Sequence, residues 1–248
     1  MRIDVLTSGS KGNSCLVRDG KTTILIDCGS TKKYLMDELK KAGIQIDDIQ
    51  GVLITHAHTD HVSQLKHFSH LPIYSYCELN KVELDQHRIV KPGTIFTIGT
   101  FTIRVIRLSH DSPNTVGFVI YNDEHKLVYI TDTGFIPNSE HAYLKDADYY
   151  IFESNHDISM LLDSNRPMYL KQRILGDSGH MCNEDATKYL MSFMGPHTRY
   201  VVLAHISDEC NSPEKAYEIF MDALQNSAQS KHIRVCAMPQ RTSYTIKD

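Results

Sequence analysis

The sequence predicts an α/β (α+β) protein in which β-sheets are covered by helices. Short apolar segments separated by glycine-containing turns recur along the chain and indicate strands. Longer segments with one apolar face are interspersed among them and are typical of helices. Helices among strands in both halves favour sheets with covered faces, although periodicity alone leaves the strand order open.

The N-terminal part is rich in short strands. A helix is expected at residues 32–42, where Leu35, Leu39 and Ala42 form one apolar face and Gly43 ends the helix. The strands predicted around it lie at residues 3–6, 14–17, 23–26 and 52–55.

Further strands and two helices are predicted in the remaining chain. A helix is expected from Asn183 to Met194, since acidic residues fill its first turn. Ser212-Pro213-Glu214 opens another helix that continues to about Leu224. The strands expected here lie at residues 72–76, 94–98, 102–108, 116–121, 127–131, 149–153 and 199–204, with a pair of short strands at 233–236 and 241–246.

The composition is ordinary for a globular protein. The chain has 248 residues, 41% hydrophobic and 23% charged, and we expect a single domain over residues 1–248. The formal net charge is −4, without a long run of one sign. This balance argues against a protein coated in nucleic-acid-binding charge, but it leaves room for a local basic groove.

Several features predict a cytoplasmic protein that does not enter a membrane. The start, Met-Arg-Ile-Asp, is too quickly polar for a signal peptide, and no apolar stretch approaches the roughly 20 residues of a membrane span. The cysteines form no Cys-x-x-Cys pair, so we interpret them as free thiols in a reducing compartment. They are Cys15, Cys28, Cys77, Cys182, Cys210 and Cys236.

The densest chemical signal is Thr-His-Ala-His-Thr-Asp-His at residues 55–61. It places His56, His58, Asp60 and His61 within six positions, directly after a predicted strand. Neutral imidazoles and a carboxylate are ligands for zinc or a similar divalent metal. A histidine-rich surface loop is the alternative, but no packing requirement explains so many imidazoles together.

Three later residues share the same context. His110, Asp132 and His205 each lie at or just past the end of a predicted strand, where rigid scaffolds often place chemistry. Singly, each could be a turn or capping residue. Together with the first cluster they give seven nitrogen or oxygen donors, a set that suits Zn²⁺, Mn²⁺ or Fe²⁺.

These residues resemble the signature of the metallo-β-lactamase superfamily. Its His-x-His-x-Asp-His motif stands here at residues 56–61, and the order and spacing agree over about residues 1–210. The resemblance implies an αβ/βα sandwich, in which two mixed β-sheets face each other, helices lie outside, and metals bind at one edge.

The same resemblance implies two divalent metal ions and a ligand set for each. It assigns His56, His58 and His110 to one metal, and Asp60, His61 and His205 to the other. Asp132 would bridge the two metals. Two metals sharing a hydroxide supply a nucleophile at neutral pH, and Asp60 is also placed to orient it.

A narrower likeness is to the YycJ-type (WalJ) branch of that superfamily. It rests on Ser-Gly-Ser-Lys-Gly-Asn-Ser at 8–14, Glu-Ser-Asn-His-Asp at 153–157, and Asp-Ser-Gly-His-Met-Cys-Asn-Glu-Asp at 177–185. Members are described as 5′ to 3′ exonucleases acting on DNA, so the resemblance implies a cytoplasmic, nuclease-like phosphodiesterase. The residues after His110 and the pair Met181-Cys182 depart from the pattern, which leaves the substrate preference open.

Four residues are candidates for catalysis or substrate binding outside the ligand set. His180 is the candidate for protonating the departing alkoxide, although it could instead cap the helix that follows. His156 could contact the second metal or hydrogen-bond a ligand. Residues 9–14 offer backbone N–H groups for an anion, and Ser10 and Asn13 could contact a phosphate, although such loops are often only tight turns.

A modest basic cluster precedes His180. It consists of Arg166, Lys171 and Arg173. Such a cluster usually marks a solvated helix face, but here it could also follow a nucleic-acid backbone.

The sequence therefore favours a metal-dependent phosphodiesterase acting on nucleic acid, DNA rather than RNA, most simply as a 5′ to 3′ DNA exonuclease. The alternative is a small-molecule hydrolase on the same fold, acting on a cyclic nucleotide, lactone or thioester. A metal-binding regulatory protein is a third possibility, against which the full set of seven ligands argues. His180 and the glycine-rich loop favour phosphodiesters over lactones, and the oligomeric state stays open.

Overall fold

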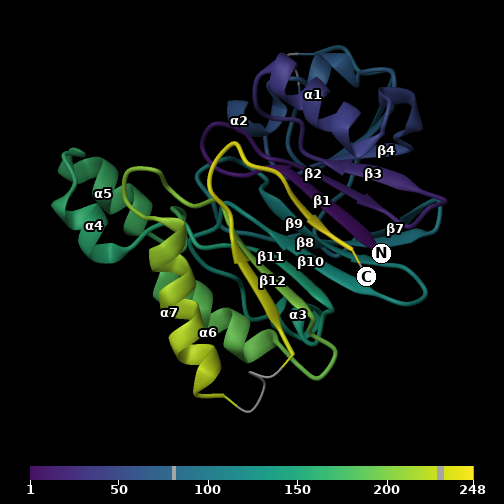
Figure 1. The fold of residues 1–248 in the computed structure, drawn as a ribbon. Helices are drawn as coiled ribbons and strands as arrows, with labels where there is room; N and C mark the ends of the chain where they lie inside the picture. Colours follow the sequence, from purple (N-terminus) through teal and green to yellow (C-terminus); the bar gives the residue numbers. More distant parts are fainter. Residues whose placement is uncertain (80–81, 228–231, 248) are drawn as a thin grey trace.

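The fold is a sandwich of two β-sheets with helices on the outer faces (Figure 1). A computed structural model describes residues 1–79, 82–227 and 232–247. Each sheet has seven strands, and both contain parallel and antiparallel pairs. This arrangement confirms the αβ/βα sandwich predicted from the sequence.

The first sheet combines the N-terminal strands with the last strand of the chain. Its order is β14-β1-β2-β3-β4-β5-β6, antiparallel from β14 to β3 and parallel from β3 to β6. The strands are β1 (Arg2–Thr7), β2 (Ser14–Arg18), β3 (Thr23–Ile26), β4 (Gly51–Ile54), β5 (Pro72–Ser75), β6 (Gln86–Ile89) and β14 (Tyr244–Ile246).

The second sheet has the order β13-β12-β11-β10-β9-β8-β7. It is parallel from β13 to β10 and antiparallel from β10 to β7. Its strands are β7 (Ile95–Ile98), β8 (Phe101–Arg107), β9 (Val116–Tyr121), β10 (Lys126–Ile130), β11 (Tyr149–Glu153), β12 (Tyr200–Ala204) and β13 (Arg234–Ala237).

Helices cover the outer face of each sheet, and one helical hairpin projects beside the sandwich (Figure 1). The first sheet is covered by α1, and the second by α6 and α7, while α4 and α5 form the hairpin. The helices are α1 (Lys32–Ala42), α2 (Thr59–Val62), α3 (His141–Leu144), α4 (Ile158–Asp163), α5 (Met168–Leu175), α6 (Asn183–Phe193) and α7 (Pro213–Gln225), with short 3₁₀ turns η1 (Ile46–Asp48) and η2 (Leu65–His67).

Alternating side chains bury both faces of the central strands. In β10, Leu127 and Tyr129 join the apolar layer between the two sheets. Val128 and Ile130 join the layer that contains residues of α6 and α7. Burial on both faces explains why the parallel strands appear in the sequence as continuous apolar runs. It also fixes the strand ends at which the predicted ligands lie.

The structure differs from the sequence prediction in a few elements. The two closing strands do not pair with each other, because β13 adds to β12 and β14 adds to β1. Asp60 and His61 lie on the short helix α2 rather than in a loop. Strand β6 was not predicted, since all its residues are exposed and show no apolar pattern. Within the described ranges, no helix has the length and apolarity required to cross a membrane.

Candidate metal centre and active-site pocket

The predicted ligands gather where strands of both sheets end. Those from the first sheet follow β4, and those from the second sheet follow β8, β10 and β12. Asp132 and His205 have φ angles of 56° and 53°. This left-handed conformation is uncommon outside glycine and tends to occur at functional sites. It turns the chain sharply after each strand.

One group of donors consists of His56, His58 and His110. One nitrogen of each lies within 4.8 Å of the others. His110 donates its Nδ1–H to the carbonyl of Gly179 at 2.9 Å, which leaves Nε2 toward the group. The Nε2 atoms of His56 and His110 are buried and, among the described residues, lack a hydrogen-bond partner. Buried nitrogens of this kind suit a metal ion, because they are costly to leave unsatisfied.

Asp132 lies at the junction of the remaining donors. Its Oδ2 is 3.2 Å from His61 Nε2 and 3.1 Å from His205 Nδ1, and its Oδ1 is 3.9 Å from His110 Nε2. Asp60 Oδ2 lies 3.4 Å from His61 Nε2. Asp132 is therefore central enough to contact two ions.

The second ligand set differs in detail from the expected one. In the described part of the chain, Asp60, His61 and His205 do not form one compact group of their own. Asp132 instead joins His56 and His61 in one group, and His205, Glu153 and His180 in another. The latter group adds Glu153 and His180 to the possible ligands.

The charges in the cluster are strongly coupled. Burial alone would lower the pKa of His61, but the carboxylates of Asp132, Asp27 and Asp60 raise it well above its usual range. Burial likewise opposes protonation of His205, yet Asp132 raises its pKa to about 9. Burial would raise the pKa of Asp132, but His205 and His61 hold it well below its usual range. Without metal, protons thus balance the carboxylates, and a divalent cation can take their place.

Asp27 orients His61 and was missed in the sequence analysis. It directly follows β3 and accepts a hydrogen bond from His61 Nδ1 at 2.8 Å. It also accepts from the backbone N–H and the hydroxyl of Thr55, at 2.9 and 2.8 Å. This leaves Nε2 of His61 directed at Asp132. Asp27 follows a strand directly, so the same sequence rule that identified Asp132 and His205 would also have identified Asp27. Its φ of 55° is close to the φ of both residues.

His180 is held by a buried glutamate. Its Nδ1 donates to Glu153 Oε1 at 2.8 Å, and its ring lies 4.9 Å from that of His110. Glu153 Oε2 also accepts from the backbone N–H groups of Thr133 and Met181, at 2.8 and 3.3 Å. Glu153 appeared only within a motif in the sequence analysis, with no role of its own. Because Glu153 engages Nδ1, the Nε2 atom of His180 remains available to a substrate.

The glycine-rich loop supports the centre rather than offering an open anion site. The backbone N–H of Gly9 donates to Asn13 Oδ1, that of Gly12 to the Gly9 carbonyl, and that of Asn13 to the Asp60 carbonyl. These three N–H groups are therefore not available to an anion. Asn13 is fully buried with its amide nitrogen 3.2 Å from Asp60 Oδ2, which does not fit a phosphate contact. Ser10 remains exposed and lines the pocket.

His156 lies apart from the donor groups. It is 1% exposed, and neither ring nitrogen has a hydrogen-bond partner among the described residues. Burial lowers its pKa to about 4. It belongs to none of the metal-type groups in the described ranges, so the structure does not support the expectation that it contacts the second metal.

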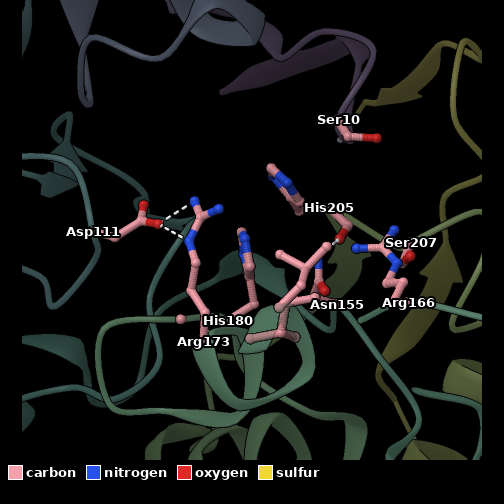
Figure 2. Close-up of a pocket in the computed structure, with 11 residues that line it drawn as sticks. Ser10, Asp111, Asn155, Arg166, Arg173, His180, His205 and Ser207 are labelled. Carbon is pink, nitrogen blue, oxygen red and sulfur yellow. Dashed lines mark hydrogen bonds and ion pairs between the residues drawn. The ribbon is translucent and has the colours of Figure 1, made fainter. Parts of the chain in front are cut away.

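A small pocket of about 130 Å³ opens beside His180 and His205 (Figure 2). Arg166 and Arg173 line it together with Ser10, Asn155 and Ser207. Asp111 closes one side through an ion pair with Arg173. The Oδ1 atom of Asp111 also lies 3.2 Å from His110 Nε2 and 3.7 Å from His58 Nε2. Asp111 is thus a further acid at the first donor group, which the sequence analysis did not single out.

Fold and donors together define a metal-dependent hydrolase of the metallo-β-lactamase fold. A family described as "Beta-lactamase superfamily domain" matches residues 22–206. The chain belongs to that superfamily and, within it, to the YycJ/WalJ branch. Both levels of the sequence resemblance are thereby confirmed.

Similar proteins include two with curated names. The chain is 33% identical to "Exodeoxyribonuclease YycJ" of Bacillus anthracis, over 87% of this chain and 86% of the relative. It is 30% identical to "Exodeoxyribonuclease WalJ" of Streptococcus pneumoniae, over 90% and 88%. The crystal structure of the metallo-beta-lactamase fold protein YhfI from Bacillus subtilis has a TM-score of 0.74 at 17% identity and covers 98% of both chains. The last likeness supports the fold alone.

Proposed function

We propose that this protein is a metal-dependent phosphodiesterase that hydrolyses DNA from a strand end, in the 5′ to 3′ direction. The observation that carries the proposal is the contact between His180 and the buried Glu153 beside the donor groups. A phosphodiester needs a proton donor near its poor leaving group, and His180, held by Glu153, is the proposed donor. The similarity to proteins named exodeoxyribonucleases supports DNA as the polymer.

Two divalent ions fit the donors. His56, His58 and His110, which form one compact group, would hold one ion. The other would bind at His61 and His205, whose ring nitrogens lie 3.2 and 3.1 Å from Asp132 Oδ2, with Asp60 beside His61. When bound, such ions lower the pKa of water and neutralise charge on phosphoryl oxygens. Imidazole and carboxylate donors suit Zn²⁺, Mn²⁺ or Fe²⁺. Asp60, close to the Asn13 amide, is placed to orient the attacking water.

His180 acts as the general acid in this proposal. The Glu153 carboxylate holds the ring through Nδ1, so Nε2 faces the pocket as the proposed donor to the departing alkoxide. Burial of Glu153 excludes water from this contact. Ser10, on the opposite side of the pocket, is placed to contact a non-bridging phosphate oxygen.

The test is hydrolysis of end-labelled single- and double-stranded DNA and RNA by protein loaded separately with Mn²⁺ and Zn²⁺. Stepwise release of nucleotides from the 5′ end is expected, and Asp60→Ala should abolish it while lowering the bound metal. Cleavage in the opposite direction would refute the polarity. Turnover of bis-p-nitrophenyl phosphate without cleavage of any polymer would favour a small phosphodiester.

A further inference from the structure

Helix α5 forms one wall of the pocket beside His180. Arg166, Leu170, Arg173 and Ile174 all line the pocket. The spacing of Leu170, Arg173 and Ile174 places these three on one face of α5, and Arg166 lies in the bend just before the helix. Leu170 and Ile174 form the apolar middle of this face, with Arg166 before the first helical turn and Arg173 in the last turn.

The two arginines lie on either side of the reaction centre. Figure 2 shows His180 and His205 between the guanidinium groups of Arg173 and Arg166. Among the described residues that line the pocket, Arg166 and Arg173 are the ones with a lysine or arginine side chain. A planar guanidinium matches the geometry of a phosphate group, so each can hold one phosphate through two hydrogen bonds.

Each guanidinium is paired with a carboxylate from a loop that leaves the second sheet. Arg173 pairs with Asp111 in the loop after β8, and Arg166 Nε lies 3.0 Å from Glu209 Oε2 in the loop after β12. Each pair joins an exposed side chain to a partly buried one, since Arg173 and Glu209 are 55% and 69% exposed and their partners Asp111 and Arg166 are 23% and 27% exposed. Ion pairs that are open to solvent on one side contribute little to folding stability, so a phosphate can replace the carboxylate.

We propose that Arg166 and Arg173 form a phosphate clamp that binds two phosphates of one polynucleotide strand, on either side of the hydrolysed linkage. Binding exchanges Glu209 and Asp111 for these phosphates. The clamp rests on the phosphodiesterase function proposed above and adds a basis for substrate selection. A strand with several phosphates engages both guanidinium groups, whereas an isolated small phosphodiester engages only one.

The first test measures binding by the metal-loaded protein, with a short single-stranded DNA whose phosphorothioate linkages resist cleavage. Arg166→Gln and Arg173→Gln should each raise the Kd about tenfold, because each loses a charge-assisted contact. Each should also reduce the slope of log K against log salt by about 0.7. Arg234→Gln is the matched control, since Arg234 pairs in register with Tyr200, at the opposite end of β12 from His205.

The second test uses the acid that the phosphate would displace. Glu209→Gln should lower the Kd for the same DNA, because it removes the competitor of Arg166 without adding a contact. The double variant Arg166→Gln/Glu209→Gln should bind as weakly as Arg166→Gln alone. If the ion pair has only a structural role, Glu209→Gln should raise the Kd for DNA, as Arg166→Gln does.

Two outcomes separate the clamp from the function on which it rests. If the protein degrades DNA but Arg166→Gln and Arg173→Gln keep the wild-type Kd and salt slope, the clamp is wrong and the phosphodiesterase stands. If the wild-type protein neither binds nor cleaves a polymer while it hydrolyses bis-p-nitrophenyl phosphate, both proposals fail for polynucleotides.

Discussion

The hydrogen bond between Glu153 and His180 allows a test of the proposed general acid that removes a charge and keeps the side-chain shape. Glu153→Gln keeps the shape of the side chain but replaces the carboxylate that accepts from His180 Nδ1 with an uncharged amide. We expect kcat on DNA to fall about 10²-fold, within the range of general acid catalysis. The loss should be smaller on bis-p-nitrophenyl phosphate, whose leaving group needs no proton.

The control for that experiment is the metal content. Glu153→Gln and His180→Ala should both retain the bound metal, measured by elemental analysis of the purified proteins. Loss of metal from both variants would identify His180 and Glu153 as ligands, a role that their proximity to Asp132 and His205 also permits.

His156 gives a residue-scale prediction for stability. Its pKa is lowered from 6.5 to about 4 by burial, so the folded protein keeps the ring neutral. The unfolded chain binds a proton below pH about 6.5, and the folded state binds it only near pH 4. The free energy of unfolding therefore keeps its full value above pH 6.5. It falls by about 3 kcal/mol as the pH falls toward 4.

Urea unfolding across this pH range checks the prediction. His156→Leu should have a flatter dependence of the unfolding free energy on pH than the wild-type protein. An identical slope in both proteins would show that His156 gains a proton with little cost in the folded state.

Single residues were predictable from the sequence when they followed an apolar strand. His110, Asp132 and His205 were found in this way because the strands before them are apolar, with nearly continuous burial in β10 and β12 and alternating burial in β8. His180 and Glu153 are far apart in the sequence, and only the packing of the loop before α6 against the end of β11 brings them together. The exposed partners Arg173 and Asp111 leave no pattern in the sequence, since ion pairs between loops follow no period.

At the scale of elements, the loop after β3 packs directly against α2. A Cβ atom at Gly29 would lie 1.6 Å from the Asp60 carbonyl oxygen, so only glycine permits this approach. Asn13 completes the same contact. The Gly29 N–H donates to the Asn13 carbonyl, and the Asn13 N–H donates to the Asp60 carbonyl. The segments around Asn13 and Gly29, which are distant in sequence from α2, thus set the position of Asp60 and His61.

Gly29→Ala should therefore displace α2 and weaken metal binding. We expect the metal Kd to rise roughly 10–100-fold, as for other losses of support around metal ligands. Titration with a competing chelator measures the change. Gly176→Ala is the milder comparison, since its added Cβ would lie 3.3 Å from the Gln172 carbonyl oxygen, a contact that a shift of a few tenths of an ångström relieves. Equal affinities in both variants would mean that α2 is positioned in some other way.

The helices and strands missed from the sequence share a lack of apolar patterning. Strand β6 is exposed at every residue and pairs with β5 at the edge of the sheet. Helices α4 and α5 expose Leu162, Met168 and Tyr169, so their apolar residues do not mark a single buried face. The covered elements, such as α1 and β10, were predictable because burial imposes a period on their residues.

For the molecule as a whole, the donors link the edges of two separate sheets. His56 and His58 follow a strand of the first sheet, whereas His110, Asp132 and His205 follow strands of the second. A metal held by both groups binds only the folded arrangement, so it stabilises the protein by mass action.

Metal at about 100 times its Kd should add about 2.7 kcal/mol of stability. For a chain of this size, we expect Tm to rise by about 5–10 °C. Differential scanning calorimetry with increasing Zn²⁺ or Mn²⁺ measures the shift, and chelation should reverse it. In Asp60→Ala the shift should shrink; a full shift in that variant would place the stabilising metal elsewhere.

The pairing of β1 with β14 also determines when folding can finish. Ile3 is the register partner of Ile246, so nearly the whole chain separates two neighbouring strands. During synthesis, β1 remains an unpaired edge of the first sheet until the strands of the second sheet and then β14 have been made. Contacts so distant in sequence slow folding, and open strand edges favour association between incomplete chains. The short strand β14 therefore pairs late with β1, and its own three residues then form the edge of the sheet.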